Sequence, residues 1–453
     1  MRKLLKRIAL LFCAGTFICP CAVNAQGQFT LSGEIRERGL YSHGYMGLLD
    51  KSRHGVFWVG QRTRLSFDYS HKNLGFFVQL EDGRIWGETD GKHSDNGFGI
   101  AQAWFFANFG KGFGLKIGRM PLTYEDGRYI SYSQWDECGK STDALILNYF
   151  STDKKTRAEL VGSFSNNSAS RFLNPYRLDN LYKYFLVAYV SHTFTPDFRW
   201  SLLSVTDFQE KHYKVFSDST QTQTITKTDP TKIYARTAVG TYLDICPERK
   251  FSALVYAYGQ FGKDMFGRSL AAGMASVILS YKPHPMVELK AAYDYISGNR
   301  NVGTDFPENT TDHSFNRFMG SSHVFLGILD LFSGSGRNDI TLGAGYHQPY
   351  LNINCLPAKN HAISLNARYF WTANKIQSVD SRNLGLEIAL TYKYNILPDL
   401  VLDFGYAIHS RTSALENLSG IETGKSRLPH YGYVMISYKP VIYNSANHPK
   451  KDK

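Results

Sequence analysis

Apolar and polar side chains alternate along much of this chain with a period of two residues. The stretch 287–298, "VELKAAYDYISG", is a clear example, because Leu289 and Tyr293 alternate with the charged Lys290 and Asp294. A period of two is typical of a β-strand whose two faces meet different surroundings. The apolar face either packs in the core of a soluble sheet, or faces lipid while the charged face lines a water-filled barrel.

The same alternation, together with the turn residues between segments, predicts eighteen strands. They are expected at 29–41, 57–70, 74–87, 98–110, 113–120, 142–150, 156–165, 182–194, 198–208, 231–242, 251–260, 270–281, 286–296, 338–348, 360–372, 382–394, 398–408 and 431–439.

The predicted connections alternate in length. Every even strand joins the next odd strand through a short segment such as "HKN", "GKG" or "NILPD", with a somewhat longer one around "NCLPAKN". Most odd-to-even connections are long, and the longest cover 299–337 and 409–430. A Greek-key sandwich has no reason to sort its connections in this way, whereas an up-and-down barrel in an asymmetric membrane does. We therefore predict an all-β fold, a transmembrane up-and-down antiparallel β-barrel of eighteen strands, which exposes no sheet edge to lipid.

The N-terminus carries an export signal. Residues 1–25 combine a positively charged start, an apolar stretch and a small-residue cleavage site, which predicts a signal peptide. The barrel is expected to span 26–439 and a basic C-terminal tail 440–453. Beyond the signal, no apolar run reaches the roughly 18 residues that a transmembrane helix needs. These features predict a protein of the bacterial outer membrane.

Charged side chains lie on the polar faces of the predicted strands. Arg36 and Arg38 on the first strand and Arg62 and Arg64 on the second share one face, so they predict a compact positive patch on the lumen wall. Such patches select anions in narrow channels. We expect alanine at Arg62 and Arg64 to leave folding intact and to shift the reversal potential toward cations. The other candidate pore-lining residues are Arg236, Glu288, Lys290, Asp294, Arg368 and Glu387 on the predicted strands, and Arg128 in the long connection 121–141.

Several segments resemble a known family. "LEDGRIWGE", "IAQAWFFANFGKGFGLKIGRM", "WDECGKSTDALILNY" and "LGLEIALTYKYNILPDLVLDFGY" are similar, in order, to the alginate export family of outer-membrane porins. The resemblance implies an eighteen-stranded monomeric barrel with an arginine-rich lumen selective for anionic sugars or similar solutes. It also implies pore-lining roles for Asp82, Arg84, Arg119 and Asp143.

The function that follows is passive passage of anionic or polar, sugar-like solutes. The expected partners are that solute, outer-membrane lipids and lipopolysaccharide, and the barrel assembly machinery. The alternatives are an exported β-rich binding protein, soluble or tethered, and an outer-membrane barrel enzyme that pairs a serine such as Ser364 with His361. We expect no cofactor, no metal and no nucleic-acid partner, because the histidines are scattered and neither "GKS" triplet has the leading glycine of a phosphate loop.

One long loop is expected to enter the lumen. The segment 299–337 contains "FMGSSHVFLGILDLF", which is too apolar to extend into water. Apolar loop segments of this length pack on something, so this loop should fold into or over the pore. Deletion of 309–326 is then expected to raise the single-channel conductance.

Overall fold

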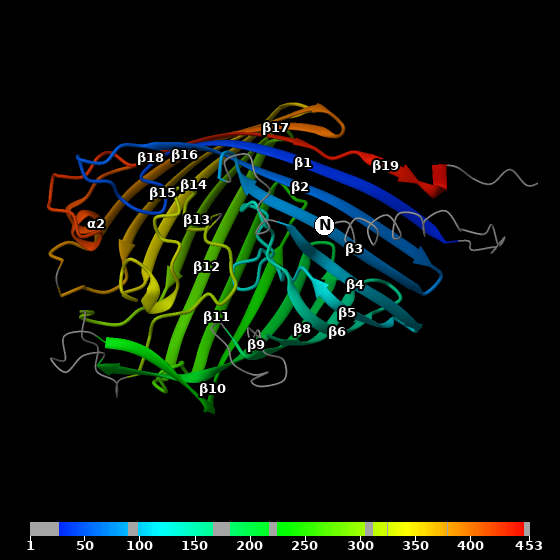
Figure 1. Cartoon of the computed structure of the whole chain (residues 1–453), viewed down its shortest axis with the longest axis horizontal. Coiled ribbons are helices and arrows are strands. Elements are labelled where there is room, and N and C mark those ends of the chain that lie inside the picture. The colour runs from blue at the N-terminus through cyan, green and yellow to red at the C-terminus, as the bar shows by residue number, and fades with distance from the viewer. Residues whose placement is uncertain are drawn as a thin grey trace, which may run out of the picture.

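A computed structural model describes residues 27–88, 98–165, 182–216, 224–303, 311–323, 325–377 and 379–447, apart from the side chains of residues 214, 216, 224 and 225. Within these ranges, eighteen antiparallel strands each pair with the next, and β1 pairs with β18, so the sheet closes into a barrel (Figure 1). The predicted signal peptide lies outside the described residues. The eighteen strands are β1 (Gln28–His43), β2 (Val56–His71), β3 (Leu74–Ile85), β4 (Phe98–Gly110), β5 (Phe113–Met120), β6 (Thr142–Phe150), β7 (Thr156–Phe164), β8 (Tyr184–Thr195), β9 (Phe198–Phe216), β10 (Thr224–Ile245), β11 (Phe251–Lys263), β12 (Ser269–His284), β13 (Val287–Ile296), β14 (Tyr346–Ala358), β15 (His361–Thr372), β16 (Asn383–Leu397), β17 (Leu400–His409) and β18 (His430–Tyr438).

The predicted barrel is confirmed, but the fourteenth strand lies later in the chain than expected. It was predicted at 338–348 and spans Tyr346–Ala358. The earlier residues stay in the preceding loop, where Gly343 and Gly345 have positive φ angles of 84° and 73° that interrupt an extended backbone. The loop between β13 and β14 therefore covers 297–345.

Short and long connections lie at opposite ends of the barrel, as the sequence predicts. The β14–β15 turn, expected to be longer, consists of only Lys359 and Asn360. At the other end, β9 continues to Phe216 and β10 begins at Thr224. The connection between them is therefore shorter than the predicted 209–230. Helix α2 (Ser413–Leu418), capped by the Thr412 side chain, lies in the long β17–β18 loop. No helix among the described residues is long and apolar enough to cross a membrane.

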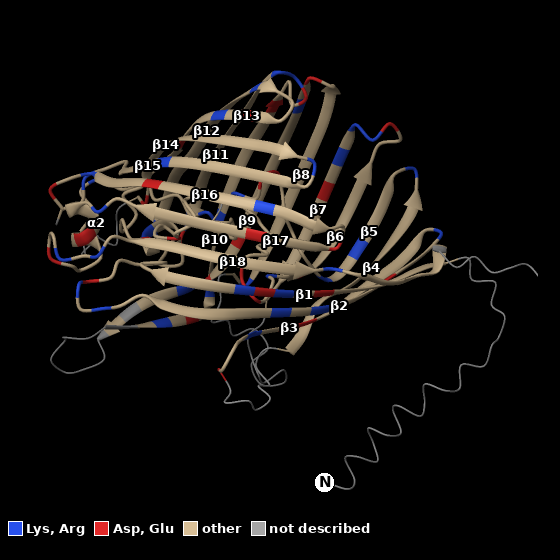
Figure 2. Cartoon of the chain, turned by 90° about the horizontal axis from the view of Figure 1, so that it is seen from above, with Lys and Arg blue, Asp and Glu red and all other residues tan. Residues whose placement is uncertain are grey.

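The two faces of the strands meet different surroundings. On β13, Leu289 and Tyr293 are 37% and 42% exposed on the outside, whereas the neighbouring Asp294 is 3% exposed inside the barrel. Charged segments lie along β1 and β2, on strands whose other positions are mostly uncharged (Figure 2). The charged face of "VELKAAYDYISG" therefore points into the lumen, as the parity predicts.

The seam of the barrel is formed by β1. It pairs with β18, with Ile35 opposite Tyr438, and then with a short strand β19 (Val441–Asn444) beyond Pro440. The red β18 and β19 lie along the blue β1 in Figure 1. Residues 441–444, which the sequence places in the basic tail, thus extend the sheet.

Candidate functional site: a lumen narrowed by two loops

Four arginines form one cluster on the inner wall of β1 and β2. Arg36, Arg38, Arg62 and Arg64 are all at most 6% exposed. Arg36 and Arg62 are direct cross-strand partners, so like charges lie side by side. Acidic residues compensate: Arg62 binds Glu34 at 2.6 Å, and Arg64 binds Glu81 at 2.5 Å. The four arginines predicted to share one face therefore form one cluster on the inner wall, paired with acidic residues.

This arginine cluster holds the loop β5–β6 (121–141) inside the barrel. Arg36 donates to the carbonyl oxygens of Gln134 and Asp136 at 2.7 and 2.8 Å, and Arg38 donates to that of Trp135 at 2.6 Å. The Glu137 carboxylate also accepts from Arg38. Arg62 also binds the Gln134 carbonyl, and Arg64 binds the Gln134 side chain, so all four guanidinium groups are covered by this loop rather than open to the channel.

The loop β13–β14 also lies inside the barrel, as expected from its apolar sequence. Phe332 and Leu329 are fully buried. This loop pairs with loop β5–β6 through a parallel bridge between Ile130 and Met319, where Ser131 N donates to the Met319 carbonyl at 3.2 Å. The two loops therefore form one unit across the lumen.

The far wall anchors loop β13–β14 by its tip. The Glu387 carboxylate on β16 accepts hydrogen bonds from the backbone N–H groups of Ile328 and Leu329 at 2.8 and 3.4 Å. Gln348 and Arg368 donate to the Phe325 carbonyl at 2.7 and 3.1 Å. Charge-assisted hydrogen bonds of this kind are among the stronger ones in proteins, so the tip is held at several points.

Arg128 joins both loops to the wall. Its guanidinium binds Asp294 on β13 at 2.6 Å and Asp126 at 2.7 Å, and it lies 4.1 Å from the centre of the Phe325 ring. Burial opposes its charge, but the surrounding groups, among them Tyr256, Asp294 and Asp126, raise the pKa of Arg128 above its ordinary value. Arg128 is therefore a permanent cation at the junction.

Trp135 lies between the side chains of Arg38 and His323. The Arg38 guanidinium is 4.2 Å from the indole centre, and the His323 ring stacks on the indole at 4.0 Å. His323 in turn contacts Asp330 at 2.7 Å, and Asp330 accepts from Tyr45 at 2.8 Å. Three loops and the β1 wall thus meet at one aromatic residue.

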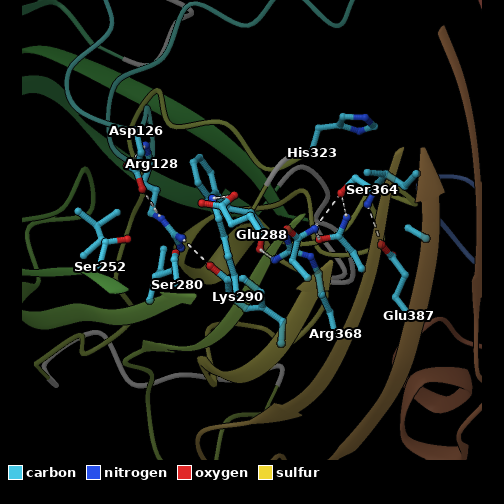
Figure 3. A pocket seen from close by; sticks show the side chains of 18 of the residues that line it. Asp126, Arg128, Ser252, Ser280, Glu288, Lys290, His323, Ser364, Arg368 and Glu387 are labelled. Atoms are coloured by element: carbon cyan, nitrogen blue, oxygen red, sulfur yellow. Dashed lines mark hydrogen bonds and ion pairs between the residues drawn. The ribbon is translucent and has the colours of Figure 1, made fainter. Parts of the chain in front are cut away.

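A cavity of about 640 Å³ lies between the loops and the wall (Figure 3). The loops contribute Trp135, His323 and Phe325, and the wall contributes Lys290 and Arg368. The lining also includes Glu288, Tyr350, Asn352, Ser364, Asn366 and Tyr433.

A second cavity of about 600 Å³ shares Glu288, Ser364 and Tyr433 with the first. It reaches Pro285 and Met286 in the short β12–β13 turn, so the two cavities adjoin between the constriction and the short-turn end of the barrel. Among the described residues, no cluster of three or more His, Cys, Asp or Glu side chains is placed to hold a metal ion.

Most of the sequence-predicted lumen residues do face inward. Glu288 and Lys290 form a 3.1 Å pair at the cavity, and Arg368 also lines it. Asp294 lies farther along β13, where it pairs with Arg128. Arg236 pairs with the fully buried Asp207 on β9, on the side of the long loops.

Four residues implied by the family resemblance do not line the lumen. Asp82 pairs with Arg84, and Arg119 with Asp143, and both pairs lie on the outward faces of their strands. The residues next to them in the strands face inward. Glu81, beside Asp82 on β3, binds Arg64, and Met120, beside Arg119 on β5, is fully buried. Strand parity therefore corrects their assignment as pore-lining residues.

The aromatic side chains of the site were not among the residues predicted to line the pore. Trp135, His323, Phe325 and Tyr350 all contact the cavity, and three of them come from loops that carry no strand periodicity. Tyr350 lies in the strand whose position was mispredicted. The apolar segment "FMGSSHVFLGILDLF", which was predicted to enter the lumen, contains His323 and Phe325, but no single residue in it was assigned to the pore.

Comparison with known proteins identifies the fold but no family. No protein-family model and no curated protein matches the chain. Among solved structures, OpdO of Pseudomonas aeruginosa has a TM-score of 0.58 at 12% identity, over 92% of this chain and 98% of that one. OccAB1 of Acinetobacter baumannii has a TM-score of 0.58 at 12% identity, over 92% and 97%. The outer membrane protein OpdK of P. aeruginosa has a TM-score of 0.54 at 9% identity, over 90% and 98%.

At such low identity the likeness concerns the fold alone. It supports the barrel fold that the sequence resemblance implies. It does not support the alginate export family, because none of these structures is described as an alginate export protein. The chain has the barrel fold of OpdO, OccAB1 and OpdK.

Proposed function

We propose that this chain is a passive channel of the bacterial outer membrane for small anionic or polar, sugar-like solutes. The observation that carries the proposal is the constriction: two inward-folded loops leave a polar and aromatic cavity that adjoins a second cavity toward the short-turn end. A narrow section lined by mixed groups lets a channel discriminate between solutes while they diffuse.

The cavity lining supports the proposed solute class. Lys290 and Arg368 face it with positive charge, while Asn352 and Ser364 supply hydrogen-bonding groups for hydroxyls. Tyr350 adds an aromatic surface, over which Arg368 lies at 4.3 Å. The structural neighbour OpdK was solved with vanillate. Vanillate is therefore a suitable first probe, and a uronate oligomer tests the alginate resemblance.

The outer wall argues against a soluble binding protein. Leu351 and Leu160 are 61% and 60% exposed on outward faces, together with many other large apolar side chains. A soluble protein rarely exposes a continuous apolar surface of this size, whereas lipid covers it without cost. This outer surface supports a location in the outer membrane, and we propose that the chain is a monomer delivered there by the barrel assembly machinery.

The described residues offer no support for the serine–histidine enzyme considered above. Ser364 faces the lumen and accepts hydrogen bonds from Asn352 and Asn366 at 2.8 and 3.2 Å. His361 contacts Tyr392 at 2.8 Å, on the opposite face of the strand. The two side chains therefore have no common site, and we propose transport without catalysis.

Planar bilayers test the proposal. The purified mature protein should insert as discrete conductance steps, prefer anions at low salt, and show current block by vanillate or a uronate. A barrel that gives no conductance steps would contradict the channel. A channel that prefers cations at low salt would contradict the anionic part alone.

A further inference from the structure

An apolar hollow interrupts the outer wall of the barrel. It encloses about 570 Å³ on the outward face of β12 to β16, and its lining is almost entirely apolar. Ala291, Leu351, Ala367 and Tyr369 are among the residues that form it. Because it lies on the lipid side, it belongs to neither cavity of the channel.

The sequence of β14 explains the hollow. Pro349 has no N–H group to donate, and the pairing between β14 and β15 lapses from His347–Trp371 to Tyr350–Arg368. The small side chains of Ala291 and Ala367 leave space among the larger Leu351 and Tyr369. The outward face of the wall is therefore hollowed at this point.

An aromatic group borders the hollow on the side of the long loops. The Tyr293 hydroxyl and the His347 Nδ1 form a 2.6 Å hydrogen bond, and the Trp371 ring stacks on His347 with centroids 5.2 Å apart. Such aromatic residues are enriched where a barrel wall meets the lipid headgroups.

Exposed cations lie beyond this aromatic group. Lys375 and Arg382 are exposed on the β15–β16 loop, and Arg300 is exposed at the start of loop β13–β14. The two loops are joined by a bridge between Val302 and Ile376. Arg382 is tied to the end of β15, where its Nε donates to the Thr372 carbonyl at 2.8 Å. Asp380 on the same loop offsets one of the three positive charges.

We propose that this surface binds a phosphorylated, acylated glycolipid of the outer leaflet, the lipid A part of lipopolysaccharide. One acyl chain occupies the hollow, the aromatic group lies at the ester level, and Arg300, Lys375 and Arg382 face the phosphates. The proposal rests on the proposed function, because it takes the long-loop end as the cell exterior. Charge complementarity favours this lipid over phospholipids, since its two phosphates can engage cations on both loops at once.

The test uses the full mature protein, purified in detergent and titrated with lipid A while Trp371 fluorescence and native mass spectra are recorded. Lys375→Glu with Arg382→Glu should weaken binding about tenfold or more, because repulsion replaces attraction at two contacts. Lys51→Glu with Arg53→Glu is the matched control, since both residues are exposed on the β1–β2 loop of the same rim. Ala291→Leu with Ala367→Leu fills the hollow without changing any charge and should also weaken binding.

The outcomes are distinguishable from those of the channel proposal. Equal weakening by the Lys51/Arg53 control, or equal affinity for lipid A and its dephosphorylated form, would overturn the site. So would a phosphatidylglycerol affinity equal to that of lipid A. Each variant is also inserted into bilayers. A variant that conducts normally but no longer binds lipid A supports the lipid site. A wild type that binds lipid A without conducting supports the lipid site and contradicts the channel.

Discussion

Arg128 and Asp294 connect the interior loops to the barrel wall through a 2.6 Å ion pair in which both side chains are almost fully buried. Removing one partner of a buried pair leaves an uncompensated charge and costs about 3–5 kcal/mol. We expect Arg128→Met to detach the loops, raising conductance and current noise. Single-channel recordings measure the conductance. The temperature at which the barrel unfolds, seen as a change in its mobility on a gel, measures the stability.

The exposed pair of Arg249 and Asp197 is the control for that variant. Arg249→Met should change stability by about 1 kcal/mol or less, because surface ion pairs contribute little. Conductance in Arg128→Met that matches this control would show that Arg128 does not hold the loops.

The selectivity of the channel should depend on Lys290 and Arg368, which face the cavity. Glutamine at either position is expected to shift the reversal potential toward cations at low salt. The shift should shrink at higher salt, because the Debye length falls from about 10 Å at 0.1 M to about 3 Å at 1 M. Reversal potentials across a KCl gradient provide the measurement.

The sequence-based prediction for Arg62 and Arg64 can be tested in the same recordings. Their guanidiniums bind Gln134 in loop β5–β6. Alanine at these positions should therefore raise conductance and noise, in addition to any shift in selectivity. A pure selectivity shift with unchanged conductance would argue that the loop is held without them.

Glu387 is expected to hold the tip of loop β13–β14. Glu387→Gln removes the negative charge that the N–H groups of Ile328 and Leu329 face. Hydrogen bonds to charged groups contribute about 1.5–3 kcal/mol, so these two amides should exchange with solvent roughly tenfold faster or more. Hydrogen exchange measured by mass spectrometry tests this. Glu288→Gln is the control, because its carboxylate pairs with Lys290 and contacts neither amide.

Acid should loosen the same loop at Asp312. Burial favours the neutral form, but hydrogen bonds from Ser314 and Asn299 and the charge of Arg337 hold the pKa of Asp312 below its ordinary value of 3.8. A lowered folded-state pKa contributes stability that is present above the ordinary value and lost as the pH falls through the folded one. Current noise should therefore rise below about pH 4. In Asp312→Asn the noise should be high at pH 7 and should change little with acid.

Strand positions and faces could be predicted because they depend on a local, two-residue period. Lys290 and Asp294 were assigned to the lumen from their immediate neighbours alone. The same parity would have placed Asp82 with the outward Phe76, and Arg119 with the outward Ile117, had it been applied to the residues taken from the family resemblance.

The docking of the loops could not be predicted, because it depends on contacts between distant segments. Arg36 and Gln134 lie 98 positions apart, and nothing in either local sequence indicates that guanidiniums will bind those carbonyls. The position of the fourteenth strand was mispredicted for a local reason. The segment "DITLGAGYH" alternates like a strand, while Pro349 weakens the strand pattern of 346–358, where β14 lies.

The pairing of β1 with β18 and β19 has a consequence for how the chain folds. Phe29 N donates to the Ser445 side chain, so the seam joins residues 416 positions apart. Contacts of such long sequence separation form slowly, because the intervening chain must be ordered first. Arg36 and Arg38 lie on the strand that completes the seam, so the last pairing to form also finishes the surface on which loop β5–β6 rests. A nascent barrel held open at β1 would then be a wide, unselective hole, and its closure and the narrowing of its lumen would be a single late event.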